Sequence, residues 1–189
     1  MEKAILLCGV GGQGILLAAK IIGAAAEISG LAVTANETHG MAQRGGSVKA
    51  LVKIGAAAGS PLVREGQADV IAALEPVEAL RWAHFLKSGG LAVVNMRPVV
   101  PVTVTSGGAK YPDDLEDRLA RVFPRLVTCD CVEAAARMGN AKLANTILVG
   151  MLSRDIPIGT GVWHEAIGRC VKPTFVEANT GAFDFGRAL

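Results

Sequence analysis

The chain has almost no excess charge of either sign and few aromatic residues. Its 19 basic and 17 acidic side chains leave a formal net charge of +2, which excludes the basic field that a nucleic-acid-binding or membrane-surface protein uses. Aromatic residues make up 4% of the 189 positions, so the hydrophobic content of 51% rests on alanine, valine, isoleucine and leucine. We expect part of this apolar surface to be buried against a partner, in homodimer contacts or in a larger complex.

Long hydrophobic runs are missing as well. The longest uncharged stretch, residues 4–19, is broken by a glycine-rich segment and falls short of the roughly 18 apolar residues that a membrane-spanning helix needs. The same break argues against a signal peptide. We therefore expect a cytoplasmic protein that binds neither membrane nor nucleic acid.

Cysteine is scarce, and its spacing fits neither a zinc site nor an iron–sulfur cluster. The four cysteines are Cys8, Cys129, Cys131 and Cys170. We expect them to be reduced, structural thiols, and we assign no metal ligand in this chain.

The most informative feature is a glycine-rich turn between a short apolar stretch, residues 4–8, and an alanine- and leucine-rich stretch, residues 15–29. The first is typical of a buried parallel strand and the second of a helix. The turn itself reads Gly9-Val10-Gly11-Gly12-Gln13-Gly14. Its G-x-G-x-x-G spacing places unpaired amides of a helix N-terminus where a phosphate can bind. Alternatively, the glycines only let the helix pack closely on the sheet.

A second candidate loop follows an expected strand at residues 31–36. It reads Gln43-Arg44-Gly45-Gly46, and it combines backbone amides with a guanidinium, which binds phosphate or carboxylate with two parallel hydrogen bonds. Because it leaves the carboxyl end of a strand, we expect it to lie beside the first turn. A surface turn with a solvated arginine is the alternative. The candidate ligand-binding residues are therefore Gly9, Gly11, Gly12, Gln13, Gly14, Gln43, Arg44, Gly45 and Gly46, and none is assigned as catalytic.

The remaining pattern predicts an α/β fold. Residues 47–54 alternate between apolar and polar side chains, as in an antiparallel or edge strand, and further strands and helices then alternate. The later strands are expected at 68–74, 91–95 and 126–130, and helices at 77–86, 111–123, 131–138, 141–153, 161–170 and 174–187. This order predicts a Rossmann-like three-layer αβα sandwich, with a mostly parallel sheet and at least one antiparallel strand. We expect one domain over residues 1–189, helical from about 131.

Several segments together resemble the gamma subunit or gamma domain of 2-oxoacid:ferredoxin oxidoreductases. They are the turn Gly9–Gly14, the segment His39–Val48, Ala68-Asp69, Glu75-Pro76, and Asn179 with Ala182-Phe183 and Gly186. Within the family, the sequence His-Gly-Met-Ala-Gln-Arg-Gly-Gly is most similar to the indolepyruvate type.

The resemblance implies a subunit of an enzyme that oxidatively decarboxylates a 2-oxo acid to an acyl-coenzyme A, with ferredoxin as the electron acceptor. Thiamine diphosphate, magnesium and iron–sulfur clusters are expected only in the partner subunits, because this chain has no cysteine run for a cluster and no Gly-Asp-Gly segment. The two loops would then hold the phosphates of coenzyme A.

Two other interpretations stay open. One is a free-standing Rossmann oxidoreductase that binds NAD(P), in which Glu37 would hold the ribose hydroxyls. The other is a scaffold subunit without a ligand.

Overall fold

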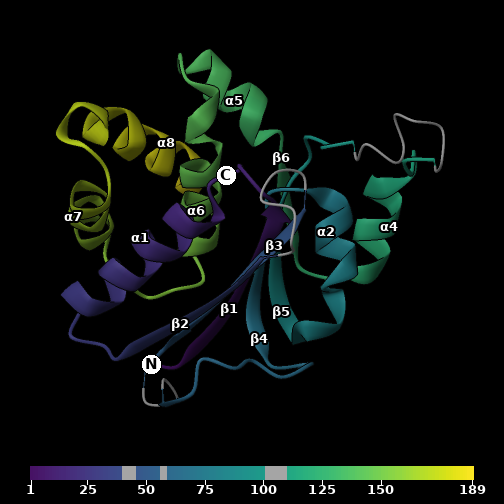
Figure 1. Ribbon diagram of the computed structural model, residues 1–189, viewed down its shortest axis with the longest axis horizontal. Helices are drawn as coiled ribbons and strands as arrows, with labels where there is room; N and C mark the ends of the chain where they lie inside the picture. Colours follow the sequence, from purple (N-terminus) through teal and green to yellow (C-terminus); the bar gives the residue numbers. More distant parts are fainter. Residues whose placement is uncertain (40–45, 56–58, 101–109) are drawn as a thin grey trace.

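The computed structural model describes residues 1–39, 46–55, 59–100 and 110–189 (Figure 1). These residues form a six-stranded sheet in the order β2-β3-β1-β4-β5-β6. The strands are β1 (Lys3–Val10), β2 (Val33–His39), β3 (Ser47–Ile54), β4 (Ala68–Ala73), β5 (Leu86–Asn95) and β6 (Leu126–Cys129). Only β3 runs against its neighbours, β1 and β2, while the pairs from β1 to β6 are parallel. The prediction of a mostly parallel sheet with an antiparallel strand is confirmed.

Helices cover both faces of the sheet (Figure 1). One face packs against α1 (Ile15–Ile28), α5 (Cys131–Arg137), α6 (Ala144–Ser153), α7 (Thr160–Cys170) and α8 (Val176–Ala188). The opposite face packs against α2 (Pro76–Arg81), the short 3-10 turn η2 (Ala83–Phe85) and α4 (Leu115–Val122). Successive side chains of a strand point to opposite faces, so β1 sends Ile5 and Leu7 into the first core and Leu6 and Cys8 into the second. This is the predicted three-layer arrangement. No helix of the described residues is long and apolar enough to cross a membrane.

One segment departs from the prediction. The expected helix over 77–86 ends at Arg81, and β5 begins at Leu86, so Gly89 and Gly90 lie inside a strand. Gly89 has φ +73°, and a Cβ at Gly90 would lie 3.0 Å from the carbonyl oxygen of Asp69. The glycines therefore allow β4 and β5 to shift register here. In the sequence, the same pair of glycines resembles a turn.

Helices α6 and α8 cross at two glycines. A Cβ at Gly186 of α8 would lie 2.0 Å from the carbonyl oxygen of Ile147, and a Cβ at Gly150 of α6 would lie 2.1 Å from that of Phe183. Backbone faces backbone at this crossing, so neither side has a flexible atom that could move away. The crossing fixes α8 on α6, every residue of which is buried.

We expect Gly186→Ala to lower the free energy of unfolding by about 1–3 kcal/mol, because the added methyl overpacks this crossing. Denaturant unfolding measures the change. Gly181→Ala on the same helix is the matched control: its Cβ would meet only the Met138 Cε, at 3.7 Å. That control should be neutral or stabilising by up to about 1 kcal/mol, since alanine is the better helix former. Equal losses in both variants would contradict the packing argument.

Candidate anion-binding site

The candidate site lies at the carboxyl ends of β1 and β4, which are parallel neighbours in the middle of the sheet. The chain leaves β1 into α1 on one face and leaves β4 into α2 on the other. Such a divergence opens a crevice at the strand ends, where ligands of open α/β sheets bind. The glycine-rich turn, residues 9–14, forms the rim of this crevice.

The turn owes its shape to two glycines in the left-handed region. Gly12 has φ +101° and Gly14 has φ +86°. Gly14 is the N-cap of α1 and supplies no side-chain cap, so the first amides of that helix are left for another acceptor. A Cβ at Gly12 would meet nothing within 4 Å, whereas one at Gly14 would lie 2.4 Å from Asn145 Nδ2. The missing side chain at Gly14 thus makes room for Asn145 of α6, while Gly12 faces open space.

Gln13 braces the turn through its side chain. Its Oε1 accepts a hydrogen bond from the amide of Val10 at 2.7 Å, and its Nε2 donates to the carbonyl oxygen of Leu74 at 2.9 Å. The same carbonyl accepts from Asn95 Nδ2 at 2.9 Å, and Asn95 Oδ1 accepts from the amide of Cys131 at 2.8 Å. The Leu74 carbonyl oxygen at the end of β4 therefore connects the glycine turn after β1 with the end of β5. Through Asn95, the same hydrogen-bond network reaches the start of α5.

The amides available to a ligand are fewer than the sequence suggests. The Gly11 amide donates to the carbonyl oxygen of Gly46 at 2.9 Å, and the Gln13 amide donates to that of Val10 at 3.2 Å. Both are used within the protein, so the expectation that they face a ligand is corrected. For the amides of Gly12 and Gly14, the described part of the chain supplies no acceptor.

Of the second predicted loop, Gln43, Arg44 and Gly45 lie outside the described residues. Its last residue, Gly46, accepts a hydrogen bond from the Gly11 amide, which continues the antiparallel pairing of β3 with β1. The following Ser47 pairs with Val10 across β3 and β1.

A buried acid fixes the start of β3. Ser47 Oγ donates to Glu78 Oε2 at 2.5 Å, and Trp82 Nε1 donates to the same oxygen at 3.1 Å. The neighbouring Glu75 accepts from the hydroxyl of Tyr111, and burial together with this hydrogen bond raises the pKa of Tyr111.

The thiol of Cys8 lies close to the same two acids. Burial, together with the negative charges of Glu78 and Glu75, raises the pKa of this thiol. It therefore stays protonated at neutral pH and offers no nucleophile.

Two hollows flank the turn and share Gly12 and Gly14. The first has a volume of about 470 Å³ and an apolar lining that includes Ile15, Leu16 and Val48. The second has a volume of about 560 Å³ and is also lined mainly by apolar groups, but its lining includes the polar side chains Asn95, Arg97, Lys142 and Asn145. Of these two hollows, only the second therefore offers basic side chains to a ligand bound at the turn.

Sequence reasoning missed Arg97 and Lys142. Arg97 stands two residues beyond β5, at the same edge of the sheet as the turn, so the strand-end rule applied to β1 would have found it. Lys142 lies in the 3-10 turn η3 (Ala141–Leu143), and nothing in the sequence indicates that this turn packs beside residues 12–14.

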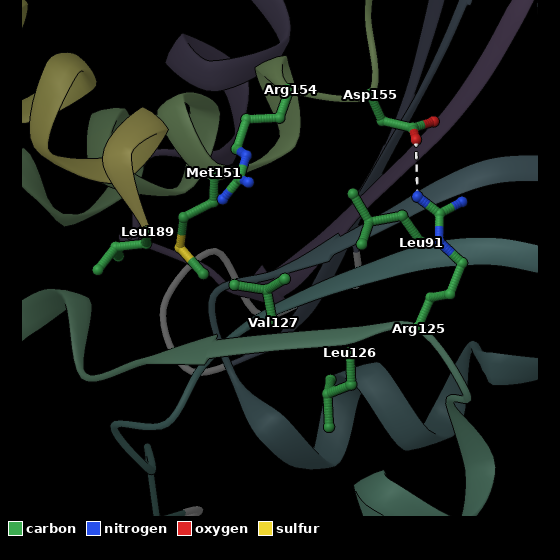
Figure 2. A pocket seen from close by; sticks show the side chains of 8 residues that line it. All are labelled: Leu91, Arg125, Leu126, Val127, Met151, Arg154, Asp155 and Leu189. Carbon is green, nitrogen blue, oxygen red and sulfur yellow. Dashed lines mark hydrogen bonds and ion pairs between the residues drawn. The ribbon is translucent and has the colours of Figure 1, made fainter.

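A third hollow, of about 330 Å³, lies along β5 and the edge strand β6 (Figure 2) and shares no lining residue with the other two. The carboxylate of this hollow belongs to Asp155. It lies 3.1 Å from Arg125 Nη2 and 2.7 Å from Lys3 Nζ. Although partial burial raises the pKa of Asp155, hydrogen bonds from Lys3 and Arg125 hold it below its usual value. This hollow therefore contains a satisfied ion cluster rather than a free acid.

Residues 4–189 match the family described as Pyruvate ferredoxin/flavodoxin oxidoreductase. The chain belongs to this family. It is 44% identical to "Indolepyruvate oxidoreductase subunit IorB" of Archaeoglobus fulgidus, over 98% of this chain and 94% of that one. These findings confirm the family resemblance and its indolepyruvate character.

Solved structures of the family share the fold. The gamma subunit of a keto/oxoacid ferredoxin oxidoreductase from Geobacter sulfurreducens superimposes with a TM-score of 0.71 at 25% identity, over 97% of this chain and 95% of that one. The 2-oxoglutarate:ferredoxin oxidoreductase from Magnetococcus marinus, solved with 2-oxoglutarate, coenzyme A and succinyl-CoA bound, matches at a TM-score of 0.71 and 22% identity. This chain corresponds to 30% of that longer chain.

We expect Gln13→Glu to make stability pH-dependent, because the charged carboxylate would face the Leu74 carbonyl without a proton to donate. The Val10 amide can donate to either form of the introduced carboxyl, whereas only the protonated form can donate to the Leu74 carbonyl. We therefore expect its pKa in the folded protein to be raised above its unfolded value of about 4.3. Stability then matches the wild type below that unfolded pKa and falls by about 1–3 kcal/mol as pH rises through the folded-state pKa.

Urea unfolding at several pH values measures this effect. Gln67→Glu, at an exposed position, is the control and should follow the wild type. A pH-independent loss in the Gln13 variant would contradict the role given to its Nε2 donor.

Proposed function

We propose that this chain is the small subunit of a 2-oxoacid:ferredoxin oxidoreductase and that its glycine turn binds the phosphates of coenzyme A. The observation that carries the proposal is that the Gly12 and Gly14 amides, at the start of α1, find no acceptor in the described part of the chain and lie in the lining of both hollows. The family membership and the names of the relatives support the same enzyme class.

The shape of the site suits coenzyme A. This ligand combines phosphate groups with a long uncharged arm, and both hollows are mainly apolar while one of them also contains basic side chains. The amides of Gly12 and Gly14 and the N-terminus of α1 favour a diphosphate, with Arg97 and Lys142 in the same hollow. The related enzyme from Magnetococcus marinus was solved with coenzyme A bound, which supports this ligand class for the family.

The chemistry is assigned to partner subunits. Thiamine diphosphate with magnesium supplies the decarboxylation there, iron–sulfur clusters transfer the electrons, and ferredoxin accepts them. The role of this chain, acting as one gamma-type domain over residues 1–189, is to bind and position the acyl acceptor.

The geometry disfavours NAD(P). In a dinucleotide-binding fold the strand that carries the ribose-binding acid lies next to the first strand. Here β3 stands between β1 and β2, the strand that carries Glu37. Two strand spacings, about 10 Å, therefore separate this acid's strand from β1.

In the assembled enzyme, Arg44→Ala should weaken the use of coenzyme A by about 1–3 kcal/mol in kcat/KM, because a charged hydrogen bond to phosphate is lost. Steady-state kinetics with coenzyme A as the varied substrate measures this. Arg64→Ala, an exposed arginine away from the lining of both hollows, is the matched control. If neither variant changes the coenzyme A kinetics, the scaffold interpretation replaces this one.

A further inference from the structure

The hollow beside the glycine turn that contains Arg97 and Lys142 is larger than one phosphate group requires. Its volume of about 560 Å³ is bounded on one side by residues 12–14, and Arg97 and Lys142 enter its lining from two other segments of the chain. We call these two side chains the basic wall. A ligand that fills this hollow meets backbone amides from one segment and two cations from others.

Lys142 is held at the mouth of the hollow by its backbone. Asn140 is the N-cap of η3, and its Oδ1 accepts from the amide of Lys142 at 3.0 Å. The turn leads directly into the buried helix α6, so the position of the Lys142 backbone is fixed by the core. Among the described residues no carboxylate lies within ion-pairing distance of its ammonium group, and the residue is exposed. The charge is therefore available to an incoming anion.

Arg97 is anchored and keeps unused donors. Its Nη2 lies 3.0 Å from Asp130 and 3.5 Å from Glu133, both near the start of α5. Its Nε is buried, and within the described part of the chain it finds no acceptor. A guanidinium has five N–H donors, so the two acids orient this group through one nitrogen and leave the other terminal nitrogen for a ligand.

We propose that the basic wall binds the 3′-phosphate of coenzyme A, while the amides of Gly12 and Gly14 face its diphosphate. This rests on the proposed function. The 3′-phosphate is a monoester that carries up to two negative charges. Because Arg97 is already paired with Asp130 and Glu133, it contributes N–H donors, and the charge that matches this phosphate better than neutral amides do comes from Lys142. The consequence is specificity: this subunit distinguishes coenzyme A from dephospho-coenzyme A, which lacks only that group.

The test compares both substrates in the assembled enzyme. Wild type should use coenzyme A with a KM lower by about tenfold or more than that of dephospho-coenzyme A, as expected for a charged hydrogen bond. Lys142→Ala should raise the KM for coenzyme A by about tenfold and leave that for dephospho-coenzyme A unchanged. Lys172→Ala, an exposed lysine that precedes the 3-10 turn η4 (Pro173–Phe175) and does not line the hollow, should change neither.

The outcomes separate this inference from the proposed function. Two results would each show that the basic wall does not recognise the 3′-phosphate. One is equal use of both substrates by the wild type, and the other is an effect of Lys142→Ala that is the same for both. If Arg44→Ala raises the KM for both substrates and Lys142→Ala for neither, only this inference fails. If neither variant affects either substrate, the proposed function fails too.

Discussion

The site depends on the carbonyl oxygen of Leu74, which accepts hydrogen bonds from both Gln13 and Asn95. Leu74 itself donates to the carbonyl oxygen of Cys8, so its amide binds β1 while its carbonyl binds the glycine turn and β5. Parallel strands end at one edge with their peptide groups unpaired, and here two amide side chains satisfy them. The glycine turn is therefore part of the sheet edge rather than a loose loop, and its open amides keep a fixed direction.

A second set of contacts reaches the turn from the C-terminal helices. Asn145 Nδ2 donates to the Gly14 carbonyl at 3.1 Å, and the neighbouring Thr146 Oγ1 lies 2.7 Å from Asn179 Oδ1 on α8. These side chains are buried, so each hydrogen bond is costly to lose. The glycine crossing of α6 and α8 sets the spacing between the two helices. The C-terminal residues that contributed to the family resemblance, Asn179 and Gly186, thus act as a structural support of the glycine turn.

Much of this architecture could be predicted because local sequence determines it. The strand, glycine turn and helix at residues 3–28 follow from a short apolar run, positive-φ glycines and an alanine-rich segment, and the alternation over 47–54 indicated the antiparallel β3. The helix predicted over 77–86 exists as α2 and η2, but its predicted end was wrong because the glycines at 89 and 90 serve strand register, which depends on β4. A local pattern does not contain that information.

The site was predicted less completely, for a similar reason. Glycine spacing indicates where amides can face a ligand, but the partners of Gly11 and Gln13 lie elsewhere in the fold, so their amides are not free. The basic wall depends on how η3 packs beside the turn, a tertiary contact between residues more than a hundred positions apart. For Arg44, the sequence predicts a role that stays a prediction, while Gly46 shows that its loop ends at the turn.

We propose that the open amides of this turn hold coenzyme A for a reaction carried out by other subunits, and a cryo-electron microscopy structure of the assembled enzyme with coenzyme A bound is the decisive experiment. We expect the diphosphate to lie within hydrogen-bonding distance of the Gly12 and Gly14 amide nitrogens. Coenzyme A held entirely by other subunits, with its phosphates away from this turn, would contradict it.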